Sequence, residues 1–276
     1  GTIGRLVKSK TTVLALTDNI IPHEKRFGDK PFTNYFVNAC HGFIAMSKAV
    51  LSDISKFSDN PNKVYSPHPM YETYGQPVGI AEARQKLNLA SGDKIILFFG
   101  LIRHYKGLDI LMEAMAHPEI KKRGIKLLIA GEFYEDKAPY LDLIKKHELQ
   151  SQVILHDRFI ANDEVRYYFC AANLVAQTYR NATNSGVTMV GYYYEKPMLV
   201  TNVGGLTEIV PDQKCGYVVK LDVSGISEKI LDYFVNDREK EFTENVIVEK
   251  KKYEWKTFIG VLIGLFEKTG VIVGRR

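Results

Sequence analysis

Cysteine is scarce in this chain of 276 residues, and the three that occur, Cys40, Cys170 and Cys215, lie far apart and are odd in number. Such spacing excludes a disulfide framework and a paired-cysteine metal site, and it favours reduced thiols in a cytosolic protein. Long apolar runs are also missing. The longest, residues 258–266, falls well short of the roughly 18 residues that span a bilayer and is flanked by charges, so we expect a buried helix there and no secretory signal peptide.

Dense blocks of Lys and Arg with interleaved aromatic residues are absent, which argues against nucleic acid as a partner. The net charge is only +5, with an isoelectric point near 8.9. An anionic ligand or an anionic membrane surface suits that balance better. The sequence also lacks a Walker A motif and a G-x-S-x-G elbow, and its His and Cys residues form no metal-binding cluster. We therefore expect no metal and no cofactor.

From residue 80 onward, apolar runs typical of buried strands alternate with amphipathic segments. The predicted strands are 94–99, 125–130, 153–155, 174–176, 198–200 and 216–219. The predicted helices are 80–89, 107–116, 139–147 and 163–171, one from near Val187, a short turn at 206–210, and long ones from Ser227 and Tyr253. This alternation predicts an α/β fold with a doubly wound parallel sheet.

The first part of the chain shows the same alternation over a shorter length. Strands are predicted at 12–16, 42–46 and 63–65, with helices at 31–39 and 48–57, the latter capped by Ser47. This stretch is too short for an independent Rossmann-type domain. We expect a partial Rossmann-like domain at 1–75 and a complete one at 76–276, with a terminal helix near 253–268 that packs back on the first part.

A basic loop follows the strand at 94–99, in the segment FFGLIRHYKGLDIL. Gly100 ends the strand, Arg103 and Lys106 occupy the loop, and a second glycine opens a helix. Loops at the carboxyl ends of parallel strands bind ligands, and two cations beside a helix start suit a diphosphate. Alternatively, Arg103 and Lys106 are ordinary solvated surface charges.

Four further strand-end segments are expected on the same rim of the sheet. They contribute Gly131 and Glu132, then Arg158, Phe159 and Ile160, then Thr183, Asn184, Ser185, Gly186 and Val187, and lastly Glu208. The TNSGV segment favours a helix start that offers backbone N–H groups to a ligand, although simple capping explains it too. Glu208 is more often a structural partner of backbone N–H groups than a catalyst.

The long loop after the first strand begins with Asp18 and contains His23 beside Glu24. A His–Glu pair can perform acid–base work, but a surface histidine among charges is the commoner case.

Taken as an ordered set, these motifs resemble family 4 glycosyltransferases of the GT-B architecture. The matching segments are FFGLIRHYKGLDIL, LLIAGEF, VILHDRFI, the TNSGV loop, and EKPMLVTNVGGLTEIV followed by GYVV. The resemblance implies two facing Rossmann-like domains and a UDP- or GDP-linked sugar as donor. It further implies that Arg103 and Lys106 hold the diphosphate, that Gly186 and Val187 offer N–H groups to phosphate or sugar, and that Glu132 and residues 158–160 border the nucleoside. Transfer would retain the anomeric configuration without a tightly bound metal.

This sequence departs from the family pattern in three respects. The two glutamates usually found eight positions apart are replaced by Thr183 and Gly191, which leaves sugar recognition to the TNS residues and backbone. Asp18 stands where many relatives place a histidine, so His23 becomes the nearest catalytic candidate by proximity. Most of the N-terminal, acceptor-binding domain is expected to be missing.

We therefore predict a glycosyltransferase that moves a sugar to a saccharide or lipid-linked acceptor in bacterial cell-surface polysaccharide or glycolipid synthesis. It would work in the cytoplasm, with peripheral contact to the anionic inner face of the membrane. The main alternative is a nucleotide-sugar-binding module or truncated inactive transferase, motivated by the two missing glutamates. A third is a sugar-nucleotide epimerase of the same architecture.

Overall fold

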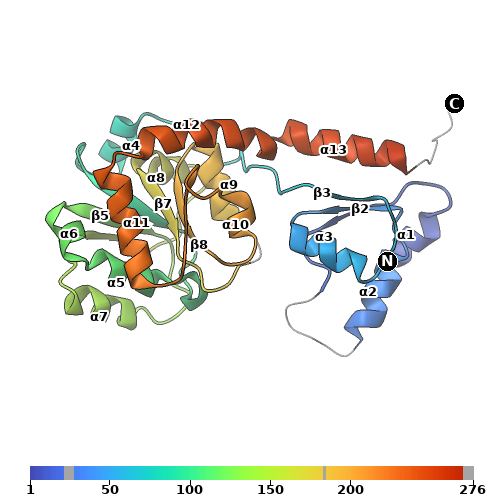
Figure 1. Cartoon of the computed structure of the whole chain (residues 1–276), viewed down its shortest axis with the longest axis horizontal. Helices are drawn as coiled ribbons and strands as arrows, with labels where there is room; N and C mark the ends of the chain where they lie inside the picture. The colour runs from blue at the N-terminus through green and yellow to red at the C-terminus, as the bar shows by residue number, and fades with distance from the viewer. Residues whose placement is uncertain (22–27, 183–184, 270–276) are drawn as a thin grey trace. The chain divides into compact units, whose positions relative to one another are not determined.

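The computed structural model describes residues 1–21, 28–182 and 185–269, and the chain divides into two compact units (Figure 1). The smaller unit comprises residues 1–69 together with the segment from Lys252, and the larger unit comprises Met70–Lys251. The segment 70–75, predicted with the N-terminal part, therefore lies in the larger unit. The terminal helix groups with the N-terminal residues.

The larger unit is built on six parallel strands, as predicted, in the order β6-β5-β4-β7-β8-β9. Their bounds are β4 Lys94–Phe99, β5 Ile125–Ala130, β6 Val153–His156, β7 Leu174–Gln177, β8 Met198–Thr201 and β9 Gly216–Val219. Strand order reverses between β4 and β7, because the chain first extends the sheet on one side of β4 and then on the other. Ligands of open α/β sheets bind at the carboxyl ends of strands at such a switch point.

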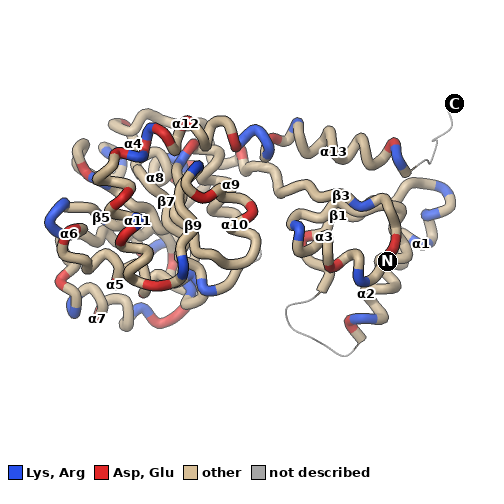
Figure 2. Tube along the Cα trace, viewed as in Figure 1, with Lys and Arg blue, Asp and Glu red and all other residues tan. Residues whose placement is uncertain are grey.

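Helices cover this sheet and bury its apolar strands. They are α4 Ile80–Lys86, α5 Leu108–Met115, α6 Pro118–Lys122, α7 Ala138–Lys146, α8 Val165–Ala171, α9 Gly186–Tyr193, α10 Leu206–Ile209, α11 Val223–Val235 and α12 Glu239–Glu249. One core cluster joins α5, α6 and α11 to alternate residues of the strands, among them Ile96, Phe98 and Leu127. Figure 2 shows Lys and Arg interspersed with Asp and Glu along the outer helices of this unit.

One helix prediction in this unit was wrong in its bounds, and two helices were missed. The helix expected from Ser227 begins at Val223, because the Asp222 carboxylate accepts the Gly225 N–H at 2.7 Å and caps an earlier start. It ends at Val235, and Asp237 has a left-handed φ of +49° before α12 begins, so one expected helix is two. The short helix α6, with Pro118 in its first turn, was not predicted.

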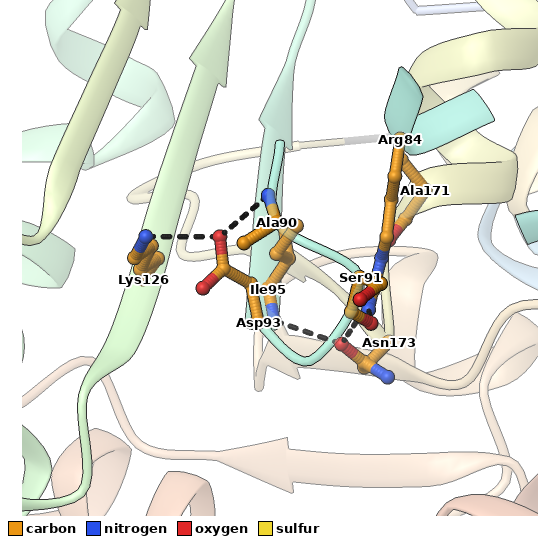
Figure 3. A network of polar contacts seen from close by, with 8 residues as sticks. All are labelled: Arg84, Ala90, Ser91, Asp93, Ile95, Lys126, Ala171 and Asn173. Carbon is orange, nitrogen blue, oxygen red and sulfur yellow. Dashed lines mark hydrogen bonds and ion pairs between the residues drawn. The ribbon is translucent and has the colours of Figure 1, made fainter. Parts of the chain in front are cut away.

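A polar network joins the amino ends of β4 and β7 (Figure 3). Asn173 Oδ1 accepts the Ile95 N–H at 2.8 Å and a guanidinium N–H of Arg84 at 3.0 Å. Its amide nitrogen donates to both carboxylate oxygens of Glu239, at 2.9 and 3.1 Å. The buried Arg84 also donates to the carbonyls of Ala171 and Ser91. Asn173 thus joins α4, β4 and α12.

The smaller unit contains three parallel strands in the order β1-β2-β3. Its elements are α1 Thr2–Val7, which was not predicted, β1 Leu14–Thr17, α2 Asp29–Val37, β2 Gly42–Ala45, α3 Lys48–Ser55, β3 Lys63–Tyr65 and α13 Trp255–Lys268. The Ser47 cap is confirmed, since its hydroxyl accepts the Val50 N–H at 3.1 Å.

The terminal helix α13 is only half buried, so the expectation of a buried helix was wrong. Phe258 and Leu265 pack on Ile44 of the small sheet, whereas Ile259 and Ile263 are 46% and 52% exposed. A three-stranded sheet covers one face of a helix and leaves the opposite face to solvent. In the described part of the chain no helix has the length and apolarity to cross a membrane.

Candidate functional site

The switch point of the large sheet brings together the loops that follow β4 and β7. The β4 loop turns through Gly100, at φ +96°, and Gly107, at φ +65°, with a short 3-10 helix between them. A Cβ at Gly107 would lie 2.0 Å from the carbonyl oxygen of Thr178, so only glycine permits this approach. The Thr178 hydroxyl donates to the Gly107 carbonyl at 2.9 Å and adds a hydrogen bond between the two loops.

An ion pair that the sequence analysis missed locks these two loops together. Arg180, after β7, donates to both carboxylate oxygens of Asp109 at 2.6 and 2.8 Å and to the His104 carbonyl at 2.7 Å. Burial favours the neutral form of Asp109, but the hydrogen bond and charge of Arg180 prevail and lower the pKa of that carboxyl. The available signal was an acidic residue in the first turn of α5, Asp109, and an arginine after β7, once β4 and β7 are known to be adjacent.

Lys106 is the central cation of the site. It is 8% exposed, and its Nζ lies 3.2 Å from the position a Cβ would take at Gly100. The same Cβ position is 3.8 Å from Val187 Cγ2, so the β4 loop and the start of α9 meet over Gly100. Desolvation and, to a lesser extent, the charge of Arg103 lower the pKa of Lys106 to about 8. Among the described residues its ammonium has no hydrogen-bond or ion-pair partner.

Arg103, the other predicted cation, has a different environment. Its side chain is exposed, and its guanidinium carbon lies 4.9 Å from the centre of the Tyr134 ring. The structure therefore presents one buried and one exposed cation on the same loop, with Arg103 close enough to depress the pKa of Lys106. The two cations of the loop therefore differ in their contact with solvent.

The start of α9 differs in part from the prediction. Ser185 is the N-cap residue but makes no capping hydrogen bond; its hydroxyl instead lies 3.4 Å from that of the buried Tyr179. Gly186 is exposed, which leaves its backbone accessible. Thr183 and Asn184 lie outside the described residues.

A hollow of about 180 Å³ adjoins Gly100. Its lining residues are Tyr74, Phe99, Gly100, Leu101, Gly131, Glu132, Phe159, Ile160, Asn162 and Val165. Five of the predicted site residues thus share one depression. Pockets for whole drug-sized ligands occupy roughly 300–1,000 Å³, so this hollow suits one ring of a larger ligand.

Two predicted residues have other surroundings. Arg158 does not line the hollow; its guanidinium pairs with both carboxylate oxygens of Glu164, at 2.7 and 2.8 Å. This hydrogen bonding lowers the pKa of the Glu164 carboxyl. Glu208 is half-buried in the first turn of α10, after β8, and is not among the lining residues. The sequence could place both at strand ends but not decide which way their side chains turn.

The acid–base candidates belong to the smaller unit. Asp18 follows β1 directly and is exposed. His23 lies outside the described residues. Both therefore stay predictions.

The sequence profile of the family described as Glycosyl transferases group 1 matches residues 79–252, which include all the strand-end loops of the large sheet. The chain belongs to this family. An uncharacterised glycosyltransferase of Methanocaldococcus jannaschii is 26% identical over 204 residues, which cover 70% of this chain and 49% of that protein. The chain spans about half the length of the curated relatives it matches.

Solved structures resemble the chain over nearly its whole length. Sucrose-phosphate synthase from Thermosynechococcus elongatus superposes with a TM-score of 0.76 at 17% identity, covering 97% of this chain and 70% of the other. Anabaena HepE, solved in complex with UDP-glucose, gives 0.73 at 14% identity and covers 97% and 75%. These likenesses confirm the predicted α/β fold of GT-B type.

Proposed function

We propose that this chain binds a nucleotide-diphosphate sugar at the carboxyl ends of β4 and β7 and transfers the sugar to a saccharide or lipid-linked acceptor. The observation that carries the proposal is the convergence on Gly100 of the buried Lys106 ammonium, the start of α9 and a ring-sized hollow. A diphosphate with a base at one end and a sugar at the other needs these three features. Family membership supports sugar transfer, and the UDP-glucose complex of the similar Anabaena protein supports a UDP-type donor.

In this proposal Lys106 and Arg103 neutralise the diphosphate, and the Gly186 and Val187 N–H groups bind phosphate or sugar. Negative charge grows on the leaving diphosphate in the transition state, and preorganised donors in a dry site stabilise it without reorganisation. Gly131, Glu132, Phe159 and Ile160 border the nucleoside. The sugar would meet residues 183–185 and Glu208.

We propose retention of the anomeric configuration, with the leaving phosphate taking the acceptor's proton, and Asp18 or His23 assisting on the acceptor side. Bacterial cell-surface polysaccharide or glycolipid synthesis at the inner face of the membrane is the proposed setting. Sedimentation with vesicles of anionic lipid checks the membrane part; a protein that stays in the supernatant contradicts it.

One observation favours the alternative of a nucleotide-sugar-binding module without transferase activity. Gly191, where the family usually has its second glutamate, is buried in α9, and a Cβ there would lie 2.9 Å from the Met198 sulfur. A glutamate side chain would have to displace Met198. If the alternative holds, the protein binds the donor but transfers no sugar to any acceptor, even when supplied with the remaining domain.

Calorimetric titration with UDP, GDP and ADP tests donor binding. We expect saturable binding of one nucleotide and its loss in the Arg103→Ala/Lys106→Ala double variant. A Lys145→Ala/Lys146→Ala variant on α7 removes the same charge from exposed positions and serves as the matched control. Equal loss in the control, or retained affinity in the site variant, contradicts the assignment.

A further inference from the structure

An irregular segment at the start of the larger unit, Met70–Gly75, contributes two tyrosines to the surroundings of the candidate site. The Tyr71 ring lies against the start of α9, 3.3 Å from where a Cβ would project at Gly186. Tyr74 lines the ring-sized hollow beside Gly100. Both tyrosines are half-buried. The segment therefore touches both ends of the site.

The two rings also contact each other. Their centroids are 6.4 Å apart with planes inclined at 67°, an edge-to-face pair. Because Tyr74 belongs to the hollow and Tyr71 to the α9 start, the pair links the place where a ring would sit to the place where phosphate N–H donors lie.

The backbone of this segment is anchored from within the unit. The Tyr194 hydroxyl donates to the carbonyls of Tyr74 and Gly75, each at 2.9 Å. Tyr194 is buried and stacks on Phe169, which in turn packs edge-on against Phe99 at the end of β4. Desolvation raises the pKa of the Tyr194 hydroxyl far above neutrality, so it remains a donor. A rigid chain of aromatic side chains thus ties the segment to the strand that carries the site.

We propose that Tyr71 and Tyr74 form an aromatic wall along the donor, with Tyr74 stacked on the nucleobase and Tyr71 against the sugar at the α9 end. The proposal rests on the proposed function and adds two recognition residues to it. Stacking suits a base because every base has a π-face, and the C–H face of a sugar ring packs on an aromatic ring. Tyr194 is a positioning residue that acts through the Tyr74 and Gly75 carbonyls.

Calorimetric titration of the full chain with UMP, UDP and UDP-glucose, or the corresponding series of whichever base binds, separates the two roles. Base–aromatic stacking is worth about 1–3 kcal/mol, so Tyr74→Leu should weaken the binding of all three ligands about 5- to 150-fold. Tyr71→Leu should weaken the nucleotide sugar about 10-fold and leave the nucleoside monophosphate within about 2-fold. Phenylalanine at either position should restore affinity.

Tyr194→Phe removes the anchoring hydroxyl alone and should weaken the binding of all three ligands to a similar degree. Tyr167→Leu is the control, because Tyr167 is half-buried on α8 in the same unit and does not line the hollow. Thermal unfolding of each variant separates lost affinity from lost folding.

Wild-type affinity for all ligands in folded Tyr74→Leu and Tyr71→Leu overturns the inference while leaving the proposed function intact. Equal loss in Tyr167→Leu overturns it too, since the effect would be general. If the wild-type protein binds no nucleotide, that result contradicts the proposed function and therefore also the aromatic wall.

Discussion

The buried cations at the two ends of the large sheet differ in their hydrogen bonding. At the amino ends of β4 and β7, the guanidinium of Arg84 donates to carbonyl oxygens and to Asn173, so these two strands meet a hydrogen-bonded network (Figure 3). At the carboxyl ends, the Lys106 side chain is almost as deeply buried, yet no described residue hydrogen-bonds or ion-pairs with its ammonium, whose Nζ lies 5.7 Å from the centre of the Tyr179 ring. Desolvating a charge that has no hydrogen-bond or ion-pair partner costs stability.

This difference is expected if the amino end of the sheet stabilises the fold and the carboxyl end binds a ligand, as proposed. Groups with perturbed pKa values and incomplete pairing cluster at functional sites, whereas fully satisfied networks hold a fold together. Changes at the amino end should therefore alter unfolding and spare ligand binding. Changes at Lys106 should do the reverse.

The largest effect is expected from Asn173→Ala. It leaves the Ile95 N–H, Arg84 and Glu239 without their shared partner, and breaking a buried charged network costs about 3–5 kcal/mol. Urea denaturation should register this loss of unfolding free energy, while nucleotide affinity of the folded variant stays unchanged. Asn236→Ala, at an exposed asparagine after α11, is the control. A loss below about 1 kcal/mol would contradict the role given to Asn173.

Next in size is Lys106→Met, which replaces the buried ammonium with an apolar side chain of similar length. Nucleotide-diphosphate affinity should fall about 100-fold, or about 2.7 kcal/mol, because the fixed charge is lost. The free energy of unfolding should hold or rise, since the desolvation cost disappears. Calorimetry and denaturation on the same samples give both numbers. A variant that is destabilised and still binds would reverse the comparison.

A smaller effect is expected from the ion pair between the two site loops. In a double-mutant cycle of Arg180→Ala and Asp109→Ala, we expect a coupling energy of about 1–2 kcal/mol in nucleotide binding, because the pair fixes the loop that carries Lys106. Additive single variants would show that the two loops keep their positions without it.

The smallest effect is a pH dependence of binding. Because the pKa of Lys106 is lowered to about 8, the lysine loses its proton as pH rises through that value in the free protein. Above about pH 7, where the terminal phosphate of the nucleotide is ionised, affinity should fall as pH rises through about 8, by at most about tenfold per pH unit, one proton being linked. Lys106→Met should show no such fall; a matching fall there assigns the dependence to another group.

The lowered pKa of Lys106 also makes the free energy of unfolding depend on pH. The folded-state pKa lies below the ordinary value of 10.5, so the unfolded chain binds more protons between about pH 8 and 10.5. Stability contributed through Lys106 therefore rises with pH across this window, and the full cost of burial is present below it.

The sequence predicted the buried strands best. Runs such as 94–99 and 125–130 are apolar except for one lysine each, Lys94 and Lys126, as expected of strands covered on both faces, and both match their observed bounds. Helix ends were predicted less well, because one side chain can move them: the Asp222 cap shifted α11 by a turn. The open face of α13 depends on how much sheet lies beneath it, which no local pattern reveals.

The parts of the candidate site that could be predicted are those whose residues lie close together in the sequence. Gly100 and Lys106 sit on one loop, so their proximity could be read from the sequence. The Arg180–Asp109 pair joins residues 71 positions apart and becomes visible only with the strand order. Tyr74 was missed for a similar reason, since the segment before the first helix of the larger unit carries no strand-end signal.

The most direct measurement is the titration of the Lys106 ammonium by NMR of lysine-labelled protein, with Lys106→Met for assignment, in the absence and presence of nucleoside diphosphates. The account predicts a pKa of about 8 in the free protein, raised toward or beyond the ordinary lysine value by one of the diphosphates. An ordinary pKa in the free protein that no nucleotide changes would contradict the claim that this buried cation is held for a diphosphate.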